Sequence, residues 1–247
     1  SIIATLANLF ESNNSDSFKA FVRDLTDELH NELGFEVKKD EELEIKEVRD
    51  TINKLRAKNL DDDAFIKKFS DIFKENKMES ISEGTFFSSI LFISALDETN
   101  KIETFLEKFE NAESPQMQGR YRAVLGQVRD QNASKKIVEF MLDGRIRGAD
   151  CPYILASMIT NKYIGKKSWK VIKENFNDLL NVMPDWTASR ILDALPAIYD
   201  EEFAGDIKNF IKKNPLPSSE KLAAQKLERL EANIEFMDNL KEVNNET

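Results

Sequence analysis

Hydrophobic residues recur three and four positions apart along nearly the whole chain. This spacing places the hydrophobic side chains on one side of a helix, the side that must be buried, so it predicts helices rather than strands. About a dozen helices of roughly 10 to 20 residues each are expected, a usual length in globular proteins. The stripes that carry the pattern are Phe18, Phe21, Val22, Leu25, Leu29 and Leu33; Leu43, Ile45, Val48, Ile52 and Leu55; Phe65, Phe69, Ile72 and Phe73; Ile102, Phe105, Leu106 and Phe109; Val171, Ile172, Phe176, Leu179 and Leu180; Phe203, Ile207, Phe210 and Ile211; and Leu222, Leu227, Leu230, Ile234, Met237 and Leu240.

Residues that favour helix ends lie between these stripes. Ser114-Pro115 is typical of an N-cap followed by proline at the first helical position. Cys151-Pro152 also predicts the start of a helix, because the residue before a proline avoids helical angles. Asp200-Glu201-Glu202 places carboxylates in a first turn, where the positive end of the helix dipole stabilises them. Pro184-Asp185 and residues 215–220 are predicted to separate helices.

The most hydrophobic run of the chain, residues 86–93, follows Ser82-Glu83-Gly84-Thr85. A continuous apolar run of this length fits either a buried strand or part of a core helix. The helical stripes on both sides of the run favour the core helix, and the strand is the alternative.

The connections between the stripes are short, so consecutive helices are expected to be antiparallel neighbours. Antiparallel pairs in series predict an all-α fold, an α-solenoid of HEAT-like helix pairs, as a single domain over residues 1–247.

The composition agrees with a packed helical domain. The chain is 41% hydrophobic and 32% charged, and its 8 glycines and 6 prolines leave little material for the turns of an all-β fold. The net charge of −10 repels phosphate backbones, so nucleic acid is not an expected partner. No apolar stretch approaches the roughly 20 residues that span a bilayer, so no membrane partner is expected.

The chain opens with Ser1 and the amphipathic segment 2–10, without an initiator methionine or a secretory signal. We therefore expect a fragment of a longer protein, with a cytoplasmic location.

Residue types that serve in catalysis or metal binding are scarce. His30 is the only histidine, so a zinc site of the H-E-x-x-H kind has no ligands here. Cys151, the only cysteine, lies at a predicted helix start and is interpreted as a structural thiol rather than a nucleophile. The carboxylate runs are predicted to be solvated helix caps: Asp40-Glu41-Glu42, Asp61-Asp62-Asp63 and Glu201-Glu202. No catalytic residue, metal site or cofactor is expected in this chain.

Arginines form one cluster within this acidic chain. Its members are Arg120, Arg122, Arg129, Arg145 and Arg147. The last two lie in a predicted turn, residues 145–150, between two helices. Guanidinium groups at such a turn of a solenoid can hold a peptide carboxylate through bidentate hydrogen bonds. Ion pairs with neighbouring acidic helices are the alternative.

The stretch from Gly119 to Leu180 resembles the C-terminal helical domain of the aminopeptidase N family. This family includes the puromycin-sensitive and endoplasmic-reticulum aminopeptidases and the tricorn-interacting factors. Arg147 and Asp150 match the R-x-Q-D turn of that domain, with Ala149 in place of the usual glutamine. Trp169 and Asn175 match its W-x-F-[IL]-x-x-N-W-like helix, in which Phe176 replaces the second tryptophan.

Both ends of the chain agree with this resemblance. Leu33-Gly34-Phe35 and the later Val48-Arg49 are similar to the family's L-G-[WF] turn and L-R pair. Residues 224–236 resemble its closing helix, with Phe236 where tryptophan is frequent.

The resemblance implies a division of labour. In the family, a separate preceding domain holds the zinc, the H-E-x-x-H helix and the G-x-M-E-N strand that grips the substrate's amino terminus. The C-terminal helices form a bowl that covers the active site, limits entry to peptides and contacts the distal part of the substrate, and a hinge movement opens and closes the cavity. The implied partners are the catalytic domain of the same polypeptide and peptide substrates.

Carried over by position, Arg147 and Asp150 are the candidates for a cavity-facing, substrate-binding position. Arg120, Arg122 and Arg145 are added to them on charge and location alone. A free-standing HEAT-like scaffold that binds a partner protein is the alternative function.

Overall fold

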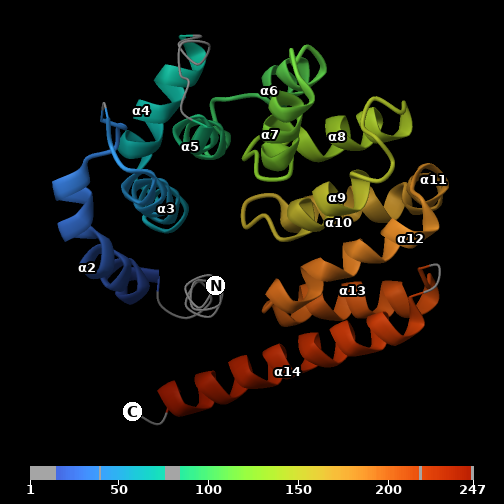
Figure 1. Cartoon of the computed structure of the whole chain (residues 1–247). Coiled ribbons are helices and arrows are strands. Elements are labelled where there is room, and N and C mark those ends of the chain that lie inside the picture. The colour runs from blue at the N-terminus through green and yellow to red at the C-terminus, as the bar shows by residue number, and fades with distance from the viewer. Residues whose placement is uncertain (1–14, 39, 76–83, 217–218, 246–247) are drawn as a thin grey trace. The chain divides into compact units, whose positions relative to one another are not determined.

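The computed structural model describes residues 15–38, 40–75, 84–216 and 219–245, and these residues fold as helices (Figure 1). They form thirteen α-helices and one 3-10 helix, without a strand in the described part of the chain, which confirms the all-α fold. The amphipathic segment 2–10 lies outside the described residues. The helices belong to two compact units, residues 16–133 and, in its described part, residues 134–245.

The unit of residues 16–133 is built around one very hydrophobic helix. Its members are α2 (Ser15–Leu33), α3 (Leu43–Asn59), α4 (Asp63–Lys74), α5 (Gly84–Ala95), α6 (Ile102–Glu110) and α7 (Pro115–Leu125). Helices α3, α4 and α7 all pack against α5, and α6 packs against α7. Phe87, Ile90 and Leu91 of α5 are buried by these neighbours. Residues 86–93 therefore form the predicted core helix and not a strand.

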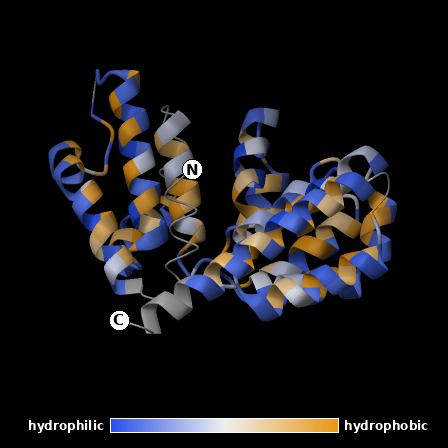
Figure 2. Ribbon diagram, turned by 90° about the horizontal axis from the view of Figure 1, so that it is seen from below, coloured by the Kyte–Doolittle hydropathy of each residue, from blue (hydrophilic) through white to orange (hydrophobic). Residues whose placement is uncertain are grey.

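The unit that begins at residue 134 ends in a long helix. Its members are α8 (Ala133–Leu142), α9 (Cys151–Ile159), α10 (Gly165–Glu174), α11 (Phe176–Val182), α12 (Asp185–Ala188), the 3-10 helix η2 (Ser189–Ala197), α13 (Glu201–Lys213) and α14 (Glu220–Asn245). Helix η2 lies between α9 and α14 and contacts both, while α10 packs against α9 and α13 against α14. Orange hydrophobic positions run along the helices in Figure 2, with blue hydrophilic positions between them.

Local capping chemistry sets several helix starts as predicted. The Ser114 hydroxyl accepts a hydrogen bond from the Met117 amide at 3.2 Å, and Pro115 opens α7. The Asp200 carboxylate accepts from the Phe203 amide at 2.8 Å at the start of α13. Helix α9 begins at Cys151, with proline in its first turn. The hydrogen bonds of Ser114 and Asp200 each satisfy an amide that has no partner within its own helix.

One of the predicted solvated caps is wrong. The Asp62 side chain does cap α4, where it accepts from the Phe65 amide at 2.9 Å. Glu41 instead binds the guanidinium of Arg49 through both carboxylate oxygens, and Arg49 is only 1% exposed. Arg49 also donates to the Leu33 carbonyl oxygen, so it joins the end of α2 to the start of α3. Hydrogen bonds from Arg49 lower the pKa of the Glu41 carboxyl.

The region after Pro184 also differs from the expected run of helices of 10 to 20 residues. Helix α12 has 4 residues, and the chain continues as the 9-residue 3-10 helix η2, which contains Pro196. A proline has no amide hydrogen and clashes with the preceding turn, so a long α-helix cannot form across it.

Within each unit, helices pack mainly against neighbours one or two positions along the chain, which is compatible with HEAT-like pairs. The predicted bowl concerns the arrangement of the two units and stays a prediction. No helix of the described residues is both long enough and apolar enough to cross a bilayer.

Candidate functional site

The turn between α8 and α9 holds three of the five predicted site residues. Helix α8 ends at Leu142, and Gly144, two residues later, has a positive φ of 73° that glycine readily adopts after a helix. The Arg145 amide then donates to the Phe140 carbonyl at 3.0 Å. Ile146 is buried and anchors the turn, so the residues on either side of it, Arg145 and Arg147, are exposed.

Gly148 fixes the position of this turn against the end of α11. A Cβ atom at residue 148 would lie 2.0 Å from the Val182 carbonyl oxygen, so any other residue would push the two segments apart. The close approach explains a glycine one residue after Arg147.

The family-matched pair meets within the turn. Arg147 Nε donates to Asp150 Oδ2 at 2.8 Å, and the Arg147 side chain is 74% exposed. This bond uses only one of the five guanidinium N–H donors, so the donors on the two terminal nitrogens remain for a ligand. The ion pair itself stabilises the fold by about 1 kcal/mol or less at this exposure. The alternative of ion pairing thus holds in part: Arg147 is paired, but its partner Asp150 lies in the same turn and not on a neighbouring helix.

The other three candidates are held differently. The Arg145 guanidinium lies 3.4 Å from the centre of the Phe140 ring, and the Arg120 guanidinium lies 5.2 Å from that of Phe87 on α5. Arg120 and Arg122 lie on α7, in the unit of residues 16–133. The structure therefore brings Arg145, Arg147 and Asp150 into one turn, and the role of all five in substrate contact stays a prediction.

A family model decides what kind of domain this is. The model of the ERAP1-like C-terminal domain matches residues 1–232 of the chain. The chain belongs to this family. The match covers the Arg147–Asp150 turn, the Trp169 helix and the Leu33-Gly34-Phe35 turn, on which the resemblance in the sequence rested.

Metal-binding residue types are scattered over the described part of this ERAP1-like C-terminal domain. Within the described residues, no group of three or more His, Cys, Asp or Glu side chains is placed to hold a metal ion. His30 packs its ring edge-on against Phe65, with ring centres 5.4 Å apart. Its buried Nδ1 has no hydrogen-bond partner, and burial together with the charge of Arg56 lowers the pKa of His30. The ring serves packing on the flank of α2.

Cys151 is a buried thiol with little nucleophilic character. Burial, followed by the nearby Asp150 carboxylate, raises the pKa of Cys151 to about 12. The thiolate is therefore negligible at neutral pH, as expected for the structural thiol that the sequence indicated.

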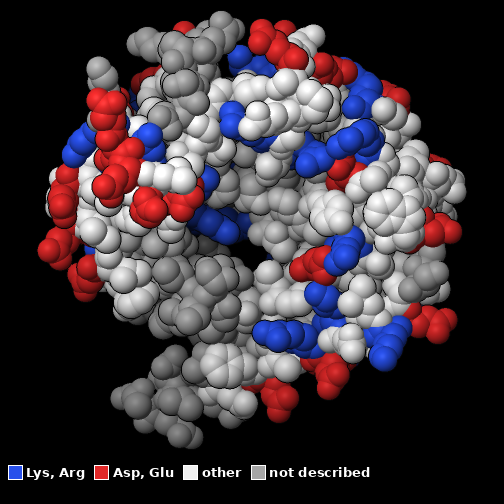
Figure 3. All heavy atoms as spheres, viewed as in Figure 1, with Lys and Arg blue, Asp and Glu red and all other residues white. Residues whose placement is uncertain are grey.

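A lysine-lined depression between α10 and α13 was not foreseen from the sequence. We call it the α10–α13 depression; its volume is about 190 Å³ and its lining residues are Lys166, Trp169, Lys170, Lys173, Glu202, Phe203 and Asp206. Trp169 Nε1 donates to Asp206 Oδ2 at 3.0 Å, and Lys173 pairs with the same carboxylate. Positive and negative side chains are likewise interspersed on the face shown in Figure 3.

Proposed function

We propose that this ERAP1-like C-terminal domain is the non-catalytic part of a zinc aminopeptidase, where it encloses the active-site cavity, controls the access of peptides and contacts the distal part of the substrate. The match over residues 1–232 is the observation that carries the proposal. Zinc and the catalytic residues belong to the preceding domain of the same polypeptide, in a cytoplasmic enzyme.

The turn between α8 and α9 supplies the substrate contact in this proposal. The terminal guanidinium nitrogens of the exposed Arg147 side chain suit a planar, two-oxygen anion such as the carboxylate at the end of a peptide. Asp150 orients Arg147 by holding Nε, which leaves the terminal nitrogens for the ligand. A long peptide reaches this turn while its amino terminus occupies the catalytic site, and a dipeptide does not.

The test is charge reversal, Arg147→Glu, in the complete enzyme. We expect kcat/KM for a peptide of about ten residues to fall about tenfold, and kcat/KM for a dipeptide to stay within about twofold. Arg190→Glu is the matched control, because Arg190 is another exposed arginine paired with an aspartate three residues away. This chain alone is expected to hydrolyse no aminoacyl anilide and to hold no zinc.

An equal loss of kcat/KM for long and short substrates would mean that Arg147 does not contact the distal part of the substrate. Hydrolysis or stoichiometric zinc binding by the chain alone would contradict the division of labour itself.

A free-standing scaffold for a partner protein is the second candidate, favoured by one feature of α2. Phe21, Leu25 and Leu29 recur every four residues, and each is between 42% and 48% exposed, which leaves an apolar stripe open to a partner. The reading frame of the gene distinguishes the two candidates. An upstream H-E-x-x-H in the same frame supports the aminopeptidase, and a stop codon followed by a separate start supports the scaffold.

A further inference from the structure

A second depression opens beside the loop that joins α5 to α6, and its lining is basic. We call it the α4–α6 depression; its volume is about 260 Å³ and its lining residues are Phe73, Lys74, Thr99, Asn100, Lys101, Thr104 and Lys108. All seven belong to the unit of residues 16–133. Three of them are cations, two carry hydroxyl groups and none is a carboxylate. Such a lining attracts anions.

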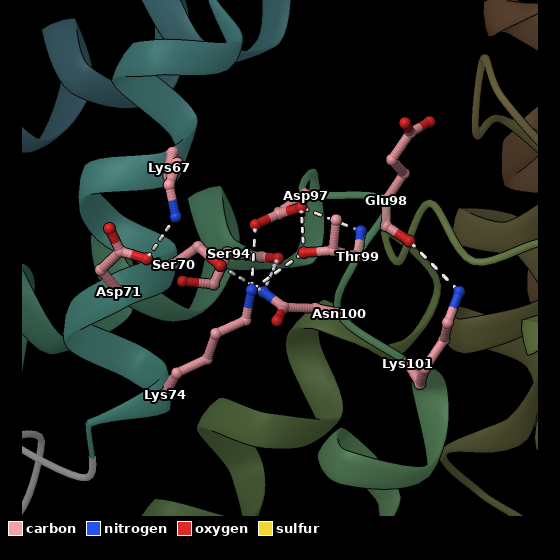
Figure 4. A network of polar contacts seen from close by, with 10 residues as sticks. All are labelled: Lys67, Ser70, Asp71, Lys74, Ser94, Asp97, Glu98, Thr99, Asn100 and Lys101. Carbon is pink, nitrogen blue, oxygen red and sulfur yellow. Dashed lines mark hydrogen bonds and ion pairs between the residues drawn. The ribbon is translucent and has the colours of Figure 1, made fainter.

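The floor and wall of this depression are firmly held. The Phe73 ring is 1% exposed and stacks on Phe105 of α6, with ring centres 4.9 Å apart. The buried Asn100 amide nitrogen donates to the Ser70 hydroxyl at 2.8 Å and to the Ser94 carbonyl at 2.9 Å (Figure 4). These contacts tie the loop to α4 and α5, so a ligand meets a pre-formed surface.

Two of the lining lysines, Lys74 and Lys101, each make at least one long contact. Lys74 Nζ lies 2.9 Å from the Thr99 hydroxyl and 3.5 Å from Asp97 Oδ2. Lys101 Nζ donates to the Glu98 carbonyl oxygen at 3.4 Å, and the Glu98 carboxylate points away from both lysines in Figure 4. Contacts of 3.4–3.5 Å lie beyond the usual range of 2.7–3.2 Å, and each ammonium has three donors. Donor capacity therefore remains for an incoming anion.

Lys108 adds a third charge on the α6 side. Its Nζ lies 5.6 Å from the centre of the Phe73 ring, within the range of a cation–π contact. The Lys108 ammonium thus lies over the aromatic ring of Phe73. It belongs to α6, whereas Lys74 belongs to α4, so the two charges border the depression from different helices.

Asp97 offsets only part of this positive charge. Its side chain is 13% exposed and accepts hydrogen bonds from the Thr99 amide at 2.9 Å and hydroxyl at 2.7 Å. Burial alone would raise the pKa of Asp97, but hydrogen bonds from Ser70 and Thr99 and the charge of Lys74 outweigh it and lower the pKa to about 2. The Asp97 carboxylate thus holds the loop through Thr99 and also pairs with Lys74.

We propose that the α4–α6 depression binds the phosphate group of a small anionic ligand. Arginine forks recognise planar carboxylates, whereas lysines are compact point charges. Several lysines around hydroxyl groups therefore suit the tetrahedral oxygens of phosphate better than they suit a carboxylate. The volume of about 260 Å³ falls below that of pockets for drug-sized molecules, so the ligand is inorganic phosphate or a small phosphomonoester.

The test is calorimetric titration of the 247-residue chain with inorganic phosphate, glycerol phosphate and malonate, a dianion whose charged groups are planar carboxylates. We expect phosphate and glycerol phosphate to bind with dissociation constants on the order of 1 mM, and malonate about tenfold more weakly. Lys74→Gln and Lys101→Gln are each expected to weaken phosphate binding about tenfold. Tighter binding of glycerol phosphate than of phosphate supports the site and assigns an ester as its ligand; the reverse supports it with free phosphate as the ligand.

The matched control is Lys166→Gln with Lys170→Gln in the α10–α13 depression, which is expected to leave phosphate binding unchanged. Lys101→Gln keeps the test decisive if Lys74→Gln unfolds, because the described contact of Lys101 is one long bond to a carbonyl. Equal affinity for malonate, an equal effect of the control variant, or no binding of either phosphate at 10-fold the expected dissociation constant would overturn the proposal.

Discussion

The α4–α6 and α10–α13 depressions have similar lining residues but differ in their carboxylates. Each is lined by three lysines beside a fully buried aromatic ring, Phe73 in one and Trp169 in the other. In the α10–α13 depression two carboxylates, Glu202 and Asp206, are part of the lining itself. In the α4–α6 depression no carboxylate is among the lining residues; the nearby Asp97 accepts hydrogen bonds from Thr99 of the loop and pairs with Lys74 at 3.5 Å.

On this proposal, the number of lysines alone does not decide whether a surface receives an anion. Asp206 accepts from the Trp169 indole and pairs with Lys173, so that carboxylate occupies the place where an anionic ligand would bind. Lys166 is paired with Asp200 at 2.8 Å in the same way. What matters is where the neutralising carboxylates lie relative to the opening.

The largest expected effect concerns the two aromatic floors, which should be equivalent. Phe73→Ala and Trp169→Ala each remove a side chain that is 1% exposed, so each should lower the free energy of unfolding by about 4 kcal/mol. Urea denaturation measures both changes. A loss below about 1 kcal/mol for either variant would mean that its ring is not part of a packed core. The two depressions would then not share a buried aromatic floor.

Removal of the carboxylates should make the α10–α13 depression bind anions as the α4–α6 depression does. Glu202→Gln with Asp206→Asn keeps an oxygen acceptor for the Trp169 indole and removes two negative charges. We expect phosphate to bind the α10–α13 depression about tenfold more tightly, a change of about 1.4 kcal/mol. The measurement uses calorimetry in a chain that also carries Lys74→Gln and Lys101→Gln, so that the other depression does not contribute.

Asp193→Asn with Glu139→Gln is the control for net charge, since both residues are exposed and pair with cations elsewhere in the same unit. An equal gain in this control would show that only the total charge of the chain matters.

The smallest expected effect is the pH dependence that Asp97 contributes. The pKa of Asp97 is lowered from 3.8 to about 2 on folding, so its ionised form favours the folded state. This contribution is present above about pH 4 and is lost as the pH falls towards 2. Asp97→Asn should therefore destabilise the chain by about 1 kcal/mol at pH 7, and the difference from the unsubstituted chain should vanish near pH 2.

Urea denaturation at several pH values measures this difference. Asp71→Asn is the control, because Asp71 forms an exposed pair with Lys67 on the same helix and should matter by less than about 0.5 kcal/mol. A constant difference between the Asp97 variant and the unsubstituted chain from pH 7 to 2 would show that Asp97 acts through shape and not charge.

Helix starts could be predicted from the sequence because a cap is a local contact. Ser114 and Met117, or Asp200 and Phe203, are three residues apart, so the donor and acceptor are adjacent whatever the rest of the chain does. Glu41 was assigned wrongly for the opposite reason. Its partner Arg49 lies eight residues away and is held in place by the Leu33 carbonyl at the end of another helix.

Neither depression could be predicted, because its residues are ordinary when taken one at a time. Lys74, Lys101 and Lys108 come from the end of α4, the loop before α6 and the body of α6, and nothing in the sequence marks them as a set. The arginine cluster was visible because its members lie close along the chain. Arg147 and Asp150 then meet within one turn, since they are only three positions apart along the chain.

The sequence by itself determined the all-α class, several helix starts, the lack of a histidine pair for zinc and the family of the domain, since these follow from spacing, capping and residue identity. Only the tertiary structure decided that Glu41 pairs with a buried arginine and which lysines face a carboxylate or an opening. The physical reason is that an electrostatic interaction depends on the distance between charges in space, and helix packing brings together residues that the chain keeps apart.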